Sequence, residues 1–135
     1  MSDNRKVIDS LENLIKAVNK LESALQIPID RELVFEGTIQ RFETVVELVW
    51  KTLYRGLKYE GIHPKTPRET MKKAFASGWL SGEIEWQELL NNRNSSSHEY
   101  LDEAFLEEYY EDIKEFYSPI KELSIFLENR FITEK

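Results

Sequence analysis

The sequence contains no cysteine, and it has only five glycines, four prolines and two histidines. Without cysteine, the chain can form neither a disulfide framework nor a thiolate metal site. The two histidines, His63 and His98, are far apart and form no His-x-x-x-His pair, which argues against a zinc enzyme. So few glycines and prolines leave little room for the turns of an all-β fold. The composition favours a helical protein, and we expect no metal and no cofactor.

Long apolar runs and an excess of positive charge are also absent. No segment has the length of a membrane span, and Met1–Lys6 leads into an amphipathic pattern rather than an apolar signal sequence. We therefore expect a cytoplasmic protein with no membrane contact. The chain has 25 acidic and 18 basic residues, which gives a formal net charge of −7. This balance argues against non-specific binding to long nucleic acids, but it permits a small, locally basic cleft.

Helical periodicity runs along nearly the whole chain of 135 residues, which is long enough for one domain with its own core. We expect a single domain over residues 1–135. Apolar residues three and four positions apart predict a first helix from about Ile8 to Leu25. A second helix is expected from an N-cap at Asp30 to about Glu60. Its apolar arc is wide enough to contact more than one neighbour.

Three further helices are predicted after Glu60. Thr66 suits an N-cap, with Pro67 at the first helical position and Glu69 completing a capping box, and this short helix should end at Gly78. A fourth helix is expected over 81–93. The last helix covers 105–127, and Pro119 should kink or split it. Five helices with short connections predict an all-α, up-and-down bundle.

A polar segment between the last two expected helices carries the residues best suited to chemistry. It consists of Arg93-Asn94-Ser95-Ser96-Ser97-His98, followed by Glu99 and Tyr100. Arg93 can bind a phosphate through two parallel hydrogen bonds, and His98 can take or give a proton near neutral pH. The Tyr100 hydroxyl can donate a hydrogen bond or receive a transferred group. A structural alternative also exists, in which Arg93 complements the carbonyls of a helix end and the polar run is a solvated loop.

The most basic stretch of the chain consists of His63, Lys65, Arg68, Lys72 and Lys73. Arg68 and Lys72 lie four residues apart and share a helical face. In an acidic protein, Lys65, Arg68 and Lys72 are candidate contacts for RNA or another anion. The alternative is an ordinary solvated helix surface.

Taken together, the chain resembles the HEPN superfamily of small helical-bundle proteins, which carry an Arg-x4–6-His motif with a polar residue after the arginine. Arg93, Asn94 and His98 match this motif, and Tyr100 extends it to the Arg-x4-His-x-Tyr form of HepT-like proteins. A second stretch is similar to the second-helix signature of the branch called nucleotidyltransferase substrate-binding proteins. It consists of Gly37-Thr38-Ile39-Gln40-Arg41-Phe42-Glu43, continuing to Glu47-Leu48-Val49-Trp50-Lys51. The resemblance covers essentially the whole domain.

The resemblance implies a homodimer that brings two copies of the motif together across a cleft, and a separate minimal nucleotidyltransferase, encoded nearby, as partner. It implies a metal-independent ribonuclease toxin in which Arg93 and His98 are catalytic and Asn94 supports the motif. The partner neutralises such a toxin by transferring AMP to the motif tyrosine, here Tyr100. The chemistry agrees, because a 2′-hydroxyl of RNA can attack the adjacent phosphate when His98 moves protons and Arg93 stabilises the developing charge.

A non-catalytic subunit that binds substrate or nucleotide for the nucleotidyltransferase is the alternative function. In that case Arg93 and the basic stretch hold a phosphate, and His98 only forms hydrogen bonds. The same arginine–histidine pair serves both functions, so the sequence leaves the choice between them open.

Overall fold

The computed structural model describes residues 2–27, 34–82, 86–88 and 103–133. Within these residues the chain is helical and contains no strand. The helices are α1 (Ser2–Leu25), α2 (Val34–Tyr59), α3 (Pro67–Ala76) and α5 (Glu103–Glu128), and α5 continues into a π-helical segment, η1 (Asn129–Thr133). The predicted all-α helical bundle is confirmed. None of the described helices is long and apolar enough to cross a membrane.

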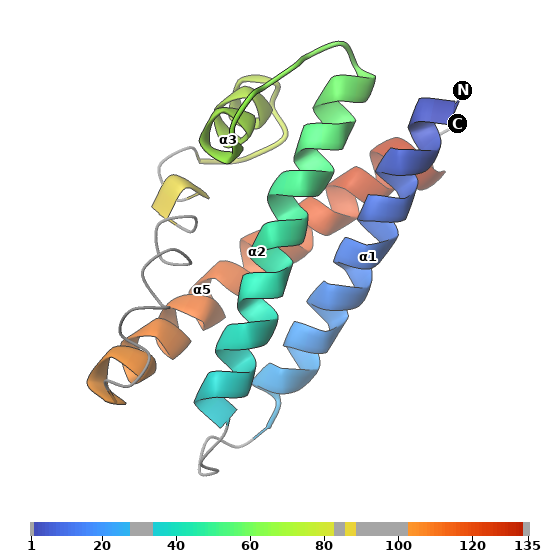
Figure 1. The fold of residues 1–135 in the computed structure, drawn as a ribbon. Helices are drawn as coiled ribbons and strands as arrows, with labels where there is room; N and C mark the ends of the chain where they lie inside the picture. The colour runs from blue at the N-terminus through green and yellow to red at the C-terminus, as the bar shows by residue number, and fades with distance from the viewer. Residues whose placement is uncertain (1, 28–33, 83–85, 89–102, 134–135) are drawn as a thin grey trace.

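α1 and α2 form an antiparallel pair (Figure 1). α1 buries one stripe of side chains spaced by three and four residues, namely Val7, Leu11, Leu14, Val18 and Leu21, because this spacing places them on one face of a helix. A buried hydrogen bond joins the hydroxyl groups of Ser10 and Thr52, with the two oxygens 3.0 Å apart. Since an unpaired buried hydroxyl is costly, this bond sets how far α1 is shifted along α2.

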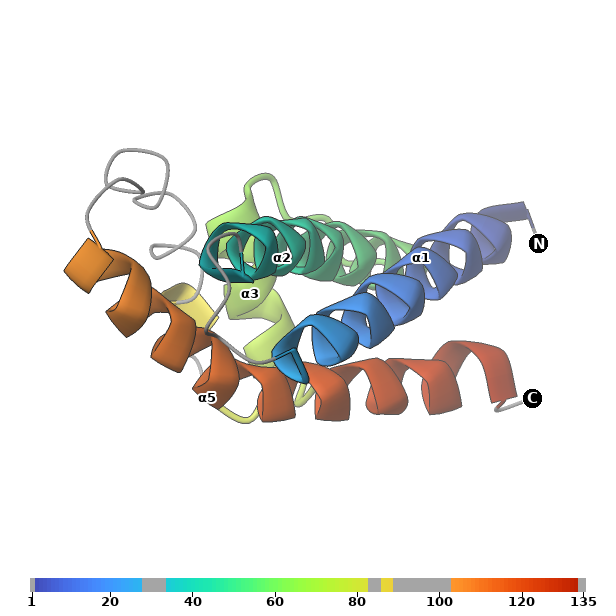
Figure 2. The ribbon, with the colours of Figure 1, turned by 90° about the horizontal axis from the view of Figure 1, so that it is seen from below.

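α2 is the central helix and contacts α1, α3 and α5, as its wide apolar arc predicts. α5 lies across one side of the α1–α2 pair (Figure 2). The ring of Phe42 is completely buried there, edge-on to Tyr109 at 5.8 Å between ring centroids and stacked with Phe116 at 6.1 Å. Near the other end of α2, a Cβ on Gly56 would lie 3.2 Å from the rings of Phe131 and Trp79. Glycine at position 56 therefore lets these rings approach α2 closely.

α3 begins and ends as its sequence predicts. The Thr66 side chain caps the helix by accepting a hydrogen bond from the Glu69 amide at 3.0 Å. The Glu69 carboxylate accepts from the Lys65 amide at 2.8 Å, so the acidic partner of the cap reaches the residue before Thr66. The helix stops at Ala76, and Gly78 adopts a positive φ of 84°. Glycine tolerates this conformation without steric strain.

The sequence predicts that Pro119 either kinks or splits the last helix, and α5 shows which of the two occurs. The helix continues through Pro119 as one element, so the predicted split is wrong. α5 changes direction in its middle part (Figure 2). Proline removes one helical hydrogen bond, but Ile113, Ile120 and Leu127 on either side of it are completely buried. Packing of these side chains therefore keeps the two halves on one core.

Two further expectations concern the ends of the second and fourth helices. The expected N-cap at Asp30 and most of the expected helix over 81–93 lie outside the described residues, although 86–88 are helical. Trp79 and Trp86 are 7% and 4% exposed and belong to the core.

Candidate functional site

The predicted catalytic segment lies outside the described residues. Arg93, Asn94, His98 and Tyr100 all fall within 89–102. Their expected placement between two helices therefore stays a prediction. What the structure does show is how the remaining charged side chains are distributed over α1, α2, α3 and α5.

The basic stretch predicted to contact RNA or another anion spans the α2–α3 connection and α3. Lys65 and Lys72 are exposed. Arg68 donates from Nη1 to Oε1 of Gln87 at 3.3 Å, and Gln87 Nε2 donates to the Arg68 carbonyl at 3.2 Å. Arg68 thus ties α3 to the helical turn at 86–88, while Lys65 lines a cavity beside α2.

Two cavities on the second half of α2 share Tyr54 and Arg55, and we call them together the basic–aromatic surface. The first has a volume of about 370 Å³ and is also lined by Lys6, Lys58 and Tyr59. The second has a volume of about 350 Å³ and is also lined by Trp50, Lys51, Lys65, Thr66 and Pro67.

Cations and aromatic rings alternate on this surface. The ammonium of Lys58 lies 6.0 Å from the centroid of the Tyr54 ring, and the Trp50 ring lies edge-on to Tyr54 at 6.5 Å. Lys51 is 3.9 Å from the Glu47 carboxylate, the salt-bridged pair that its i, i+4 spacing indicates. Positive charge beside the exposed Tyr59 ring and the partly exposed Tyr54 ring suits single-stranded nucleic acid, whose phosphates need cations and whose bases stack.

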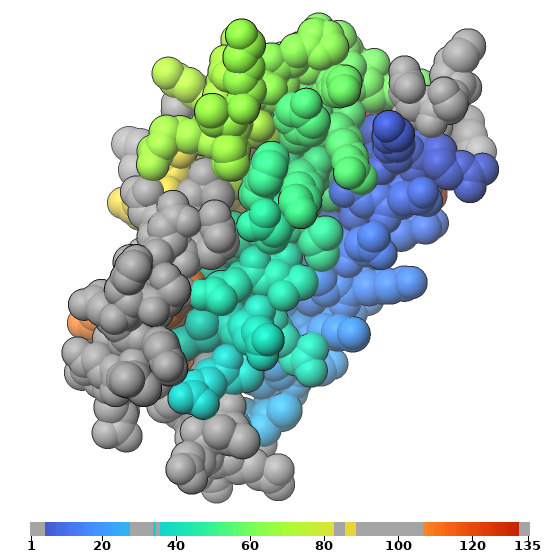
Figure 3. Space-filling view, viewed as in Figure 1, coloured from blue at the N-terminus to red at the C-terminus, as the bar shows by residue number. Residues whose placement is uncertain are grey.

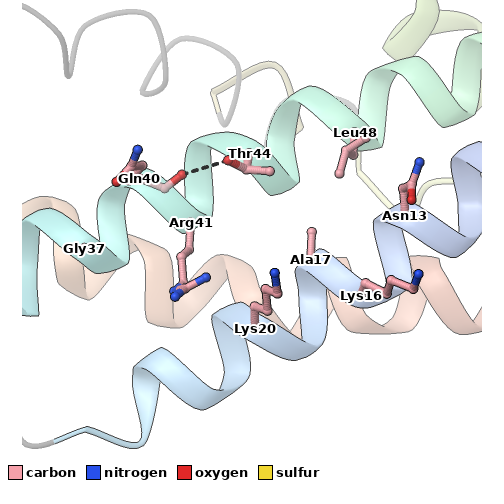
Figure 4. Close-up of a pocket in the computed structure, with 9 residues that line it drawn as sticks. All are labelled: Asn13, Lys16, Ala17, Lys20, Gly37, Gln40, Arg41, Thr44 and Leu48. Atoms are coloured by element: carbon pink, nitrogen blue, oxygen red, sulfur yellow. Dashed lines mark hydrogen bonds between the residues drawn. The ribbon is translucent and has the colours of Figure 1, made fainter.

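A larger basic cavity, the α1–α2 groove, lies between the second half of α1 and the first half of α2 (Figure 4). Its volume is about 680 Å³, and the described residues that line it are Asn13, Lys16, Ala17, Lys20, Gly37, Gln40, Arg41, Thr44 and Leu48. An adjoining hollow of about 280 Å³ shares Lys20 and Arg41. Three of these lining residues are cationic and none is acidic, in a protein of net charge −7.

The side chains of Lys20 and Arg41 enter the groove from opposite helices (Figure 4). Among the described residues, no ion pair involves Lys16, Lys20 or Arg41. Figure 3 shows α1 and α2 side by side on the face away from α5. The three cations therefore face solvent and are available to an external anion.

Helix pairing explains why these cations meet. The Ser10–Thr52 hydrogen bond aligns the antiparallel helices at one level. Because both helices have the same rise per residue, moving from Ser10 to Lys20 on α1 corresponds to moving from Thr52 to Phe42 on α2. Arg41 is next to Phe42 in the sequence, so it comes to lie across the groove from Lys20.

α5 carries a contrasting acidic region in its first half. Its charged side chains include Glu107, Glu108, Glu111, Asp112 and Glu115, with a single lysine, Lys114, 3.3 Å from Glu111. Burial raises the pKa of the Asp112 carboxyl above its usual value, and the charges of Glu115 and Glu108 raise it further. This region repels phosphate groups.

Tyr117 and Lys121 attach α5 to α1. Burial raises the pKa of Tyr117 to about 12, and its hydrogen bond to the Glu22 carboxylate contributes to this shift. Lys121 lies 4.0 Å from the same carboxylate. Tyr117 therefore stays protonated near neutral pH and has a structural role. Among the described residues, no group of three or more His, Asp or Glu side chains is placed to hold a metal ion.

The groove residues Lys16, Lys20 and Arg41 did not emerge from sequence reasoning. Lys16 and Lys20 are spaced by one helical turn, and Arg41 lies within the second-helix stretch 37–43. Each signal alone is ordinary for a solvated helix. Only the alignment of α1 with α2 brings them together.

Comparison with known protein families gives one match. A family model described as "Nucleotidyltransferase substrate binding protein like" matches residues 9–129, which is nearly the whole chain and includes the Arg93–Tyr100 segment. No curated protein matches the chain.

Proposed function

Since the chain belongs to the HEPN/HepT-like family of nucleotidyltransferase substrate-binding proteins, we propose that it is a metal-independent ribonuclease toxin that a partner nucleotidyltransferase neutralises. The observation that carries the proposal is the complete Arg93-x4-His98-x-Tyr100 motif in a chain that the family model matches over 9–129. The family description supports the partner, and the motif supports the reaction.

The proposed reaction is an internal transesterification of RNA. His98 of one protomer removes the proton from a 2′-hydroxyl, and the 2′-oxygen attacks the adjacent phosphorus. The bond from phosphorus to the 5′-oxygen breaks, and that oxygen takes a proton from the second His98 of a homodimer, leaving a cyclic phosphate and a 5′-hydroxyl. Arg93 stabilises the charge on the non-bridging oxygens. General acid–base catalysis of this kind contributes about 10²–10⁴-fold to the rate.

Neutralisation follows from the position of Tyr100. The partner transfers AMP from ATP to the phenolic oxygen, and pyrophosphate leaves. The product carries a bulky anion close in sequence to Arg93, where it competes with the RNA phosphate and blocks access.

The basic–aromatic surface supports RNA binding. It combines Arg55, Lys58 and Lys65 with the Tyr54 ring, and it includes one of the three residues, Lys65, that the sequence predicts as an anion contact. An acidic protein needs such a local surface to hold RNA against its overall negative charge.

The second candidate function is a non-catalytic subunit that binds substrate or nucleotide for the nucleotidyltransferase. The α1–α2 groove favours it, because a cavity with three cations can hold phosphate groups without any reaction.

The decisive experiment incubates the purified chain with RNA in excess EDTA. Arg93→Ala and His98→Ala should each abolish cleavage and growth inhibition, while Tyr100→Phe should still cleave RNA but escape neutralisation by the partner. Arg5→Ala is the matched control, because Arg5 is exposed on α1 and lines none of the described cavities. Circular dichroism checks folding. If the wild type cleaves no RNA with or without its partner, and Arg93→Ala weakens nucleotide binding, the ribonuclease proposal fails and the binding subunit stands.

A further inference from the structure

The geometry points to the α1–α2 groove as a binding site for one nucleoside triphosphate, with the phosphates between Lys20 and Arg41 and the base towards Leu48. This inference deepens the binding function proposed above and rests on it for its biological role. It places the nucleotide away from the Arg93–Tyr100 segment of the sequence, and it requires no ribonuclease activity.

Charge is the first argument. Elsewhere on the helices, lysines have acidic neighbours, as in the pairs Lys51–Glu47 and Lys114–Glu111. Lys16, Lys20 and Arg41 form no ion pair among the described residues. A triphosphate brings several negative charges at once, and the Arg41 guanidinium with the Lys20 ammonium can bind them through charge-assisted hydrogen bonds.

Size is the second argument. The groove volume of about 680 Å³ lies in the range of small-molecule sites, roughly 300–1,000 Å³. Gly37 and Leu48 line its two ends, and their separation of eleven positions corresponds to about 16 Å along α2. That length is comparable with an extended nucleoside triphosphate.

The two ends of the groove differ in chemistry (Figure 4). Lys20 and Arg41 lie nearer the Gly37 end, Ala17 lies beside Lys20, and Leu48, Asn13 and Lys16 lie towards the other end. An apolar floor beside an amide suits a nucleobase, which is flat, largely apolar on its faces and hydrogen-bonding at its edge. Leu48 and Asn13 thus suit a nucleobase at that end, and the Lys16 ammonium can donate a hydrogen bond to an acceptor at the edge of the base.

Gly37 provides an independent observation. It lies inside α2, is exposed, and a Cβ built on it meets no atom within 4 Å. Glycine is less favourable than alanine in a helix, and no described neighbour requires it here. Close approach of a ligand to the helix backbone accounts for a glycine at this position.

The composition of the lining separates this site from an RNA-binding surface. The described lining of the groove contains no aromatic ring on which bases of a strand could stack. The rings are found on the basic–aromatic surface instead. A single nucleotide is therefore the better match to the groove.

Calorimetric titration of the full chain with ATP tests the inference. We expect ATP to bind, and Lys20→Glu and Arg41→Glu each to weaken binding at least tenfold, since hydrogen bonds to charged groups contribute about 1.5–3 kcal/mol. Arg41→Lys should retain part of the affinity. Arg5→Glu is the matched control, because it makes the same charge change at an exposed site on α1 outside the groove.

Gly37→Ala provides a sharper test. The added methyl group fits the isolated protein, so the melting temperature should rise, while the affinity for ATP should fall several-fold. A structural glycine would show the opposite effect on the melting temperature and none on ATP binding.

Further binding measurements with other ligands and variants distinguish the possible outcomes. Tripolyphosphate binding as tightly as ATP would show an anion site without base recognition and would overturn the nucleoside assignment. Loss of ATP binding in Arg93→Ala but not in Arg41→Glu would move the nucleotide to the motif and overturn the groove. A short single-stranded RNA that competes fully for the groove would also contradict it. If the chain cleaves no RNA but binds ATP in a way that depends on Arg41, the nucleotide site in the groove is supported. That result would refute only the ribonuclease function.

Discussion

The α1–α2 groove and the first half of α5 carry charge of opposite sign, and their charged side chains have different surroundings. In the groove, three cations stand together without an acidic partner among the described residues. On α5, burial raises the pKa of Asp112, and the charges of the neighbouring acidic side chains raise it further. The groove exposes cations that form no ion pair among the described residues, whereas on α5 Asp112 binds a proton more tightly than an isolated carboxyl group does.

The difference shows that a net charge of −7 describes neither surface. Phosphate recognition depends on the local field, which the groove and the basic–aromatic surface reverse. In the proposed function, the acidic region of α5 has a complementary effect, because its negative charge disfavours binding of RNA on that side. Four predictions probe this contrast, beginning with the core that holds both regions.

Phe42→Ala should have the largest effect, because its ring lies between α2 and the aromatic residues Tyr109 and Phe116 of α5. Truncating a fully buried phenylalanine lowers the free energy of unfolding by about 3–5 kcal/mol. Urea denaturation measures the loss. Ile125→Ala, at a side chain 47% exposed on α5, is the control and should stay within about 0.5 kcal/mol. A loss below about 1 kcal/mol for Phe42→Ala would contradict the described packing.

Tyr54→Ala should weaken binding of single-stranded RNA by about 1–3 kcal/mol, the usual contribution of one stacked base. Fluorescence anisotropy in a His98→Ala background, which prevents cleavage, gives the affinity. Phe75→Ala removes an aromatic ring that is 40% exposed on α3, outside the basic–aromatic surface, and should leave the affinity unchanged. Equal losses in both variants would remove the distinction between this surface and the rest of the molecule.

A paired and an unpaired arginine should differ in their contribution to stability. Arg130 donates to Glu60 through two hydrogen bonds of 2.6 and 2.8 Å, and its guanidinium lies 5.2 Å from the Trp79 ring. Arg130→Ala should cost about 1 kcal/mol of unfolding free energy. Arg41→Ala should cost less than about 0.5 kcal/mol, because Arg41 has no ion pair among the described residues. Thermal denaturation of both variants at low and high salt tests this, and a larger loss for Arg41→Ala would assign that residue a structural role.

Asp112→Asn should have the smallest effect and the opposite sign. The native pKa of Asp112 is raised above its ordinary value of 3.8, so the native state binds the proton more tightly than the unfolded state. Stability therefore falls as pH rises from 3.8 to the native pKa, and ionised Asp112 remains unfavourable above it. The variant should be more stable than the wild type at pH 7, by no more than about 0.5 kcal/mol. That advantage should disappear below pH 3.8, which melting curves across pH can follow.

Much of the fold was predictable from local patterns. Thr66, Pro67 and Glu69 are close in sequence, so the start of α3 depends on bonds that these neighbours form with one another. The wide apolar arc of α2 likewise predicted several packing partners, because helical periodicity alone decides which side chains share a face. The outcome at Pro119 depended instead on core packing of Ile113 and Ile120, which no local rule contains.

For the basic surfaces too, one part was predictable from the sequence and another part depended on tertiary structure. Lys65, Arg68 and Lys72 were predicted from proximity in sequence, yet Gln87 engages Arg68, and Lys65 acquires its aromatic neighbours from α2. The start of α3 and the apolar faces of α1 and α2 were determined by the sequence itself, because they arise from interactions within a few residues. The α1–α2 groove was decided only by tertiary structure, because Lys20 and Arg41 meet through the alignment of two antiparallel helices, and that alignment depends on buried contacts such as Ser10–Thr52 between distant parts of the chain.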